Sequence, residues 1–118
     1  MACGQLHYLE IVTPDVDDTC AIYARLHGVS FSAPVEELGQ ARTAPMPWGG
    51  TVGIRSPMHS AEEPVTRPYL RVADIEAACS AAVEAGGVIV VPSMEIPGGR
   101  GKCAIFQQGS VQHGLWQL

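Results

Sequence analysis

The chain has 118 residues, of which 47% are apolar and 16% charged, with a formal net charge of −5. This size and balance predict one folded domain and argue against a disordered chain. The negative charge and the lack of any run of Lys or Arg argue against nucleic acid and anionic membranes as partners.

The chain shows no targeting or redox signal. The longest unbroken apolar stretch, 88–92, is only a strand's length, and the first residues lack a basic-then-apolar leader pattern. Its four cysteines, Cys3, Cys20, Cys79 and Cys103, lie far apart without a CxxC spacing. We therefore expect reduced structural thiols and a cytoplasmic protein without a metal knuckle.

The first half opens with a predicted strand over Tyr8–Thr13, rich in aromatic and branched residues. Asp15 is a good N-cap for the next helix, because a carboxylate accepts the free N–H groups of a first turn. That helix is predicted to end at Gly28 in a left-handed conformation. Further strands are predicted over 29–34 (VSFSAP), 41–46 and 51–54, and a turn-rich linker follows over 56–66.

The second half repeats this order. A strand is predicted over Tyr69–Ala73, then a helix capped by Asp74 and closed by Gly86 and Gly87, then strands over 88–92, 102–107 and 112–117. Identities shared at an offset of 59 residues link the two halves: Asp15 with Asp74, Cys20 with Cys79, Gly28 with Gly87 and Val29 with Val88. The offset indicates an internal duplication.

Duplication predicts an α+β fold with one domain over 1–118. Its first βαβββ module covers about 5–55, and its second covers about 67–118. A four-stranded sheet with one helix leaves its other face open, so we expect the two modules to pair into one curved, cup-shaped mixed sheet. Such a hollow would hold a small-molecule ligand, and open sheet edges favour a homodimer.

The two-residue period of a strand predicts which side chains face the hollow. In the first strand Leu9 and Ile11 would face the helix, with Tyr8, Glu10 and Val12 on the other side. In the second module Leu70 and Val72 would face the helix. In the last strand Gly114, Trp116 and Leu118 share one face, opposite His113, Leu115 and Gln117.

The candidate site residues lie on these faces or near them. Glu10 could act as a general base, or pair with Arg71 or Arg55 as a structural ion pair. Arg55 and Arg71 could instead hold an anionic ligand or stay solvated. Aromatic residues could form a wall for an aromatic or charged ligand, although core packing explains them equally well: Tyr8, Trp48, Tyr69, Phe106 and Trp116.

The sequence resembles the vicinal oxygen chelate superfamily, the glyoxalase, bleomycin-resistance and dioxygenase fold. The resemblance rests on VTPDVDDTCAIYARLHGVSF and on VADIEAACSAAVEAGGVIVVPSMEIPGGRGKCAIF continuing to GLWQ, with its GG, V-x-x-P and IPG pattern. Members typically hold a divalent metal through His, Glu or Gln. The corresponding positions here carry Tyr8, Arg67 or Tyr69, and Gly114, so no metal and no cofactor are expected.

The resemblance leaves three interpretations of function. The first is a metal-free small-molecule binding protein of the glyoxalase/bleomycin-resistance type. The alternative is a lyase, isomerase or dioxygenase-type enzyme that uses an atypical metal site or Glu10 as general base. The third is a partner subunit whose hollow is filled by side chains. Fold alone does not decide among them.

Overall fold

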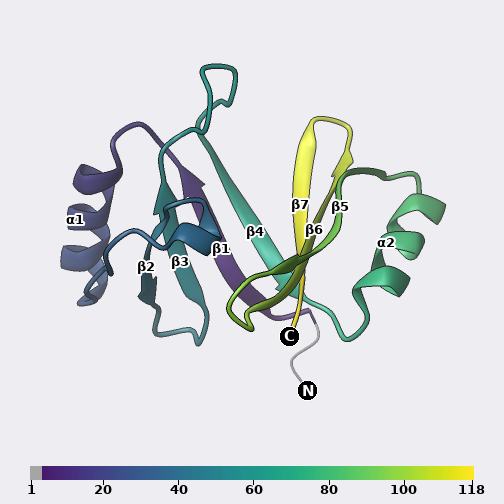
Figure 1. Ribbon diagram of the computed structural model, residues 1–118, viewed down its shortest axis with the longest axis horizontal. Coiled ribbons are helices and arrows are strands. Elements are labelled where there is room, and N and C mark those ends of the chain that lie inside the picture. The colour runs from purple at the N-terminus through teal and green to yellow at the C-terminus, as the bar shows by residue number, and fades with distance from the viewer. Residues whose placement is uncertain (1–3) are drawn as a thin grey trace. The chain divides into compact units, whose positions relative to one another are not determined.

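The computed structural model describes residues 4–118 (Figure 1). Over these residues the chain forms seven strands, two α-helices and one short 3-10 helix. They fall into two compact units. The N-terminal unit is Tyr8–Thr66, and the C-terminal unit is Arg67–Leu118 together with the segment that leads to His7.

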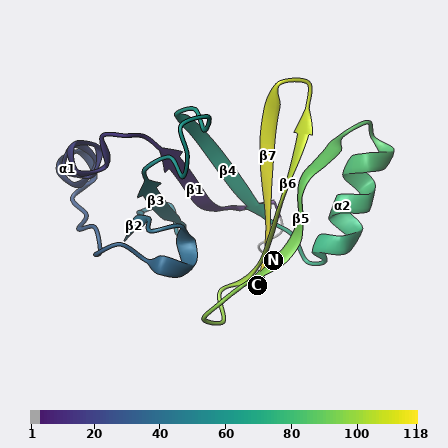
Figure 2. The same ribbon diagram turned by 45° about the horizontal axis from the view of Figure 1, so that its top comes forward.

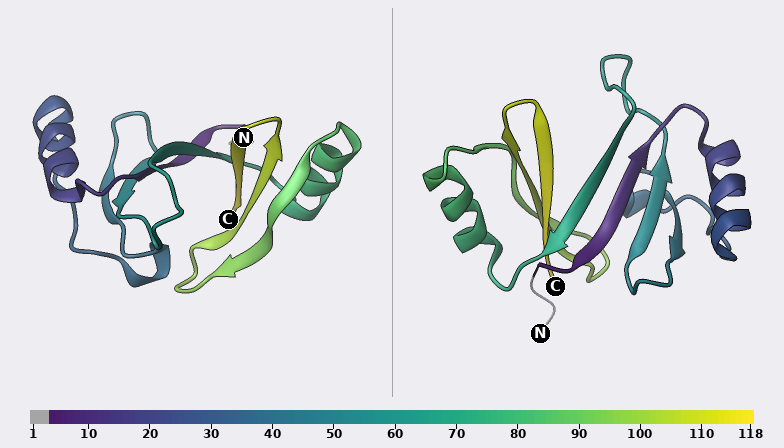
Figure 3. Two further views of the ribbon diagram at one scale, coloured as in Figure 1. Left: turned by 90° about the horizontal axis from the view of Figure 1, so that it is seen from above. Right: turned by 180° about the vertical axis from the view of Figure 1, so that it is seen from behind.

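The N-terminal unit contains one α-helix, one short 3-10 helix and three paired strands. Its elements are β1 (Leu6–Val12), α1 (Val16–His27), the 3-10 helix (Glu36–Leu38), β2 (Arg42–Pro45) and β3 (Thr51–Arg55). The central strand, β3, pairs antiparallel with β2 and parallel with β1. α1 lies beside this sheet in both views of Figure 3.

The core of this unit lies between α1 and one face of the sheet. Cys20 of α1 packs with Ile11, Val52 and Ile54 of the strands, and Leu9 packs against the same cluster. Leu9 and Ile11 therefore face the helix as predicted. By the two-residue period, Tyr8, Glu10 and Val12 take the opposite face.

The two ends of α1 differ in how well the sequence predicted them. Gly28 closes the helix at φ 65°, the left-handed conformation expected there. Asp15 does occupy the N-cap position, but its side chain makes no capping hydrogen bond, contrary to the prediction. Its own N–H donates to Thr13 Oγ1 at 3.1 Å, and its backbone, at φ −105° and ψ 53°, is not the extended one of a typical N-cap.

The segment 29–34 is not a strand, so the first half has one strand fewer than predicted. It does run beside β2, since the Ser32 N–H donates to the Thr43 carbonyl at 2.8 Å. In return the Thr43 backbone N–H donates to the Ser32 hydroxyl and not to a backbone carbonyl. A side-chain acceptor here, followed by Pro34 without an N–H, breaks the regular ladder.

The C-terminal unit has the complete predicted order of elements. They are β4 (Val65–Arg71), α2 (Ile75–Glu84), β5 (Val88–Ile96), β6 (Gly101–Gln108) and β7 (Val111–Gln117). The sheet runs β4-β7-β6-β5, with β4 parallel to β7 and the other pairs antiparallel. Figure 2 shows the β6–β7 hairpin and α2 beside β5.

The core of the C-terminal unit lies under α2. Ile75, Ala104 and Leu115 are buried together, with Val72 packed against them. Gln117 accepts a hydrogen bond from the Ile75 N–H at 2.8 Å, so Leu115 and Gln117, which were predicted to share a face, lie on the side of the helix. Leu70 was expected on this side but is 41% exposed, because α2 packs mainly over β5, β6 and β7 rather than over β4.

The two helices lie at the offset expected from the predicted repeat. α1 begins at Val16 and α2 at Ile75, which are 59 residues apart, and each covers one face of its own sheet. The predicted α+β class is therefore confirmed. Residues 4–118 include no helix with the length and hydropathy of a membrane span.

Candidate functional site

Glu10 and Arg55 form a buried ion pair on the face of the N-terminal sheet that is turned away from α1. β1 and β3 run parallel with Glu10 opposite Gly53, so Arg55 follows two residues later on the same face. Arg55 Nε donates to Glu10 Oε2 at 2.8 Å. The two residues are only 5% and 9% exposed. Arg55 and Arg71 were the two partners predicted for Glu10, and the ion pair in the structure is the one with Arg55.

A second carboxylate, from Glu62, holds the other side of the Arg55 guanidinium. Arg55 Nη1 and Nη2 donate to Glu62 Oε1 and Oε2 at 2.9 and 2.7 Å. These hydrogen bonds lower the pKa of Glu62 to about 2, and the same contacts raise the pKa of Arg55. Glu62 was not predicted as a site residue, because nothing in the turn-rich segment distinguishes it from the adjacent Glu63.

The aromatic residue next to this ion pair is Tyr8. Its ring lies over Gly53, where a β-carbon would overlap the Tyr8 hydroxyl. Tyr8 is 5% exposed. The N-terminal unit therefore brings together three of the predicted site residues: Tyr8, Glu10 and Arg55.

The C-terminal unit brings together another group of predicted residues. The Tyr69 and Trp116 rings pack edge to face with centroids 5.7 Å apart, and Gly114 leaves room for the Tyr69 ring. The Trp116 indole N–H donates to the Arg100 carbonyl at 2.9 Å. Tyr69 and Trp116 are nearly buried, so they are packed as core residues are.

Arg71 lies at the end of β4 near the same aromatic residues. Its N–H donates to the Gln5 carbonyl at 2.8 Å, which fastens the N-terminal segment to β4. The His7 ring is tilted against Trp116 at 5.0 Å. Burial and the nearby charge of Arg71 lower the pKa of His7, so its imidazole is neutral near pH 7.

Phe106 and Trp48 lie apart from these groups. Phe106 stacks on His113 at 4.8 Å and packs on the cluster under α2. It therefore faces the helix and not the side that carries Tyr69 and Trp116. Trp48 lies in the turn between β2 and β3 and is 40% exposed.

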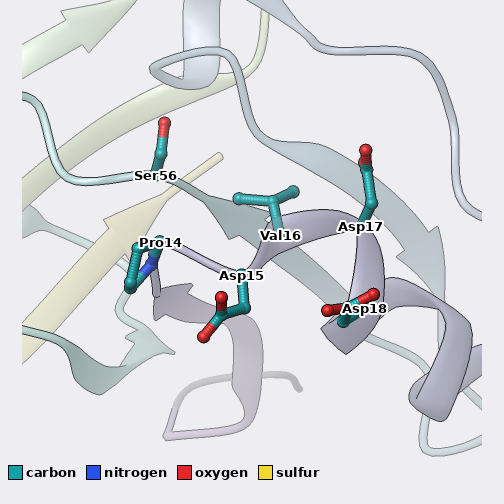
Figure 4. Close-up of a pocket in the computed structure, with 6 residues that line it drawn as sticks. All are labelled: Pro14, Asp15, Val16, Asp17, Asp18 and Ser56. Atoms are coloured by element: carbon teal, nitrogen blue, oxygen red, sulfur yellow. The ribbon is translucent and has the colours of Figure 1, made fainter.

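A recess of about 370 Å³ opens at the start of α1 (Figure 4). It is lined by Pro14, Asp15, Val16, Asp17, Asp18 and Ser56. None of the predicted site residues lines it. Asp15 contributes the carboxylate that does not cap the helix.

The positions that would hold a metal in the resembled superfamily do not fit one. Tyr8 is packed over Gly53, and Tyr69 is packed over Gly114. Arg67 carries a guanidinium that donates to Gln112 Oε1 at 3.0 and 2.7 Å, and a cation would be repelled there. Within residues 4–118 no three His, Cys, Asp or Glu side chains converge as a metal site requires.

Comparison with known proteins defines the class of the fold. No protein-family model and no curated protein matches the sequence. Solved structures do match, and the chain has the α+β fold of the vicinal oxygen chelate, or glyoxalase/bleomycin-resistance, superfamily. The predicted resemblance is thus confirmed at the level of the fold.

The similar structures include two methylmalonyl-CoA epimerases. That of Mycobacterium tuberculosis is 15% identical with a TM-score of 0.74, covering 98% of this chain and 89% of the other. A variant of the Streptomyces coelicolor enzyme, in complex with 2-nitronate-propionyl-CoA, is 14% identical with a TM-score of 0.71, covering 98% and 94%. A hypothetical protein of Bacillus halodurans C-125 is 14% identical with a TM-score of 0.74, covering 97% and 94%.

Proposed function

We propose that this chain is an isomerase-type enzyme that moves a proton at a carbon next to a carbonyl group, with Glu10 as the general base. The observation that carries the proposal is the Glu10 carboxylate, buried on a strand and oriented through Oε2 by Arg55. A base fixed in this way needs no rearrangement when the reaction begins.

The proposed reaction uses a carboxylate and an acidic C–H bond. The C–H bond breaks, its electron pair passes to the carbonyl as an enolate, and the proton forms an O–H bond on Glu10. A water molecule on the opposite side then protonates the carbon and inverts the centre, and Glu10 releases its proton to solvent, which restores the carboxylate. Epimerases with the same fold are known in complex with CoA esters, which supports acyl thioesters as the substrate class.

Exchange of hydrogen at the reacting carbon tests this proposal. Methylmalonyl-CoA and other 2-substituted acyl-CoA esters are incubated in D₂O with the protein, and deuterium at C2 is followed by mass spectrometry against a protein-free control. We expect Glu10→Gln to slow the exchange by roughly 100-fold or more, because the amide cannot accept the proton. The matched control is Glu95→Gln, an exposed strand carboxylate, which should retain the wild-type rate. Equal rates in the Glu10 variant and the wild type would refute the base assignment.

Metal-free ligand binding without catalysis is the second candidate function. It is favoured by Tyr8, Arg67 and Gly114, which occupy the positions where the superfamily holds a metal. The residues proposed to contact a ligand under either function are the three that the N-terminal unit brings together, Tyr8, Glu10 and Arg55.

Native mass spectrometry with and without chelator distinguishes the candidates. Binding alone predicts a retained small molecule, no divalent ion and no exchange at C2 of any thioester tested. Metal-independent binding would be wrong if one divalent ion were found per chain and if chelation removed both the ion and the ability to bind the ligand.

A further inference from the structure

The irregular segment 56–64 folds back on the end of β3 through the side chain of Glu62. A turn in which the Glu62 N–H donates to the His59 carbonyl at 3.1 Å presents the carboxylate. Its Oε1 also accepts the Met58 N–H at 2.7 Å. The segment therefore holds one carboxylate in a fixed place against the guanidinium of Arg55.

The contact is bidentate, and this geometry has a consequence for Glu10. A guanidinium is a rigid plane, so fixing both Nη groups also fixes the direction of the Nε–H. In Arg55 that N–H points to Glu10 Oε2. Nη1 also donates to the Ser56 carbonyl at 3.2 Å, but this single contact is longer and cannot set the plane in the same way.

The stem of Arg55 is held as well. Gly39, at φ 68°, lies against it, and a β-carbon there would be 3.1 Å from Arg55 Cδ. The same β-carbon would lie 2.7 Å from Met58 Cε. The positions of segment 56–64 and of the Arg55 stem therefore both depend on a glycine at position 39. Packing thus fixes the stem of the Arg55 side chain where it leaves β3, and the contact with Glu62 determines the orientation of its guanidinium.

We infer that Glu62 is a positioning residue, which aims the Glu10 carboxylate at its substrate by fixing the plane of the Arg55 guanidinium. The inference rests on the proposed function of Glu10. Glu62 does not accept the substrate proton itself. It acts through Arg55, and it acts as an anion throughout the neutral range because its pKa is about 2.

The test replaces Glu62 and measures two properties. In Glu62→Gln we expect kcat for C2 exchange to fall roughly 10- to 100-fold with KM nearly unchanged, because the base is misaligned and the binding surface is kept. We also expect the Arg55 Nε–H signal, identified in ¹H–¹⁵N spectra by its loss in Arg55→Lys, to exchange with solvent about tenfold faster or more. Glu62→Asp keeps the charge but shortens the reach, and should fall between Glu62→Gln and the wild type in both measurements.

The control is Glu63→Gln, which removes the adjacent exposed carboxylate and should match the wild type in both measurements. Wild-type kcat together with wild-type Nε–H exchange in Glu62→Gln would overturn the inference. If Glu62→Gln does not fold, the inference would be overturned by a Glu62→Asp variant that matches the wild type in both properties. If the wild type catalyses no exchange at all, the proposed function fails, and the Nε–H signal still shows whether Glu62 fixes Arg55.

Discussion

The ring of Tyr8 occupies the space over Gly53 that any other residue would fill with its β-carbon. Gly53 is the strand partner of Glu10, and Arg55 follows it on the same face. The glycine therefore lets an aromatic ring and a buried ion pair share one side of a narrow sheet. Its role is to leave room and not to bend the chain.

Gly53→Ala should destabilise the protein by about 1–3 kcal/mol, because the added methyl group forces the Tyr8 ring out of a packed position. The free energy of unfolding is measured by urea denaturation. In a Tyr8→Leu background the same substitution should cost clearly less, since the overlapping hydroxyl is gone. An equal cost in both backgrounds would show that the ring is not the reason for the glycine.

Arg55→Met should cost about 3–5 kcal/mol, because it leaves Glu10 and Glu62 without the cation that both bind. The matched control is Arg42→Met. Arg42 pairs with Asp17 at 2.9 Å on the surface, where the Asp17 side chain is 88% exposed, and its loss should cost about 1 kcal/mol or less. Thermal and urea unfolding give both values, and similar costs for the two variants would contradict this difference.

Stability should fall in acid because of Glu62. Its folded-state pKa of about 2 is lower than the ordinary 4.5, so its contribution is fully present above pH 4.5 and is lost as the pH falls toward 2. The contribution is on the order of 3 kcal/mol. Glu62→Gln should flatten the stability curve between these pH values and Glu63→Gln should not. A curve unchanged by Glu62→Gln would contradict the assignment.

We predict a homodimer. β5 forms one end of the sheet of the C-terminal unit, and its Val88, Val90 and Met94 are 62%, 40% and 52% exposed. Light scattering should give about twice the chain mass of 12.5 kDa. The double variant Val90→Lys, Met94→Lys should be a monomer, whereas Val111→Lys, at a valine 55% exposed on another strand, should not change the mass. A monomeric wild type would refute the prediction.

Strand faces were predictable where polar and apolar residues alternate. In β1 the apolar Leu9 and Ile11 alternate with Tyr8 and Glu10, and the structure places them on opposite faces as expected. β6 lacks this alternation, because its Cys103, Ala104, Ile105 and Phe106 are all apolar. Its register with β7 determines that Phe106 faces α2, and no local pattern contains that information.

Other features depended on contacts distant in sequence. Glu62 and Glu63 are chemically identical neighbours, and only the turn at His59 decides which carboxylate meets Arg55. The segment 29–34 has strand composition, but the Ser32 hydroxyl replaces a carbonyl in its pairing with β2. Local propensity cannot foresee a side chain that competes with the backbone.

The buried pair of Glu10 and Arg55 joins residues 45 positions apart, on strands that run in the same direction. Parallel neighbours cannot be joined by a tight turn, so the two residues are separated in sequence by the crossover that contains α1 and β2. Closing a loop of this length costs conformational entropy, and contacts between residues far apart in sequence slow folding. A chain in which β1 and β3 have not paired lacks the contact that orients Glu10, so the chemistry proposed here requires this parallel pair to be formed.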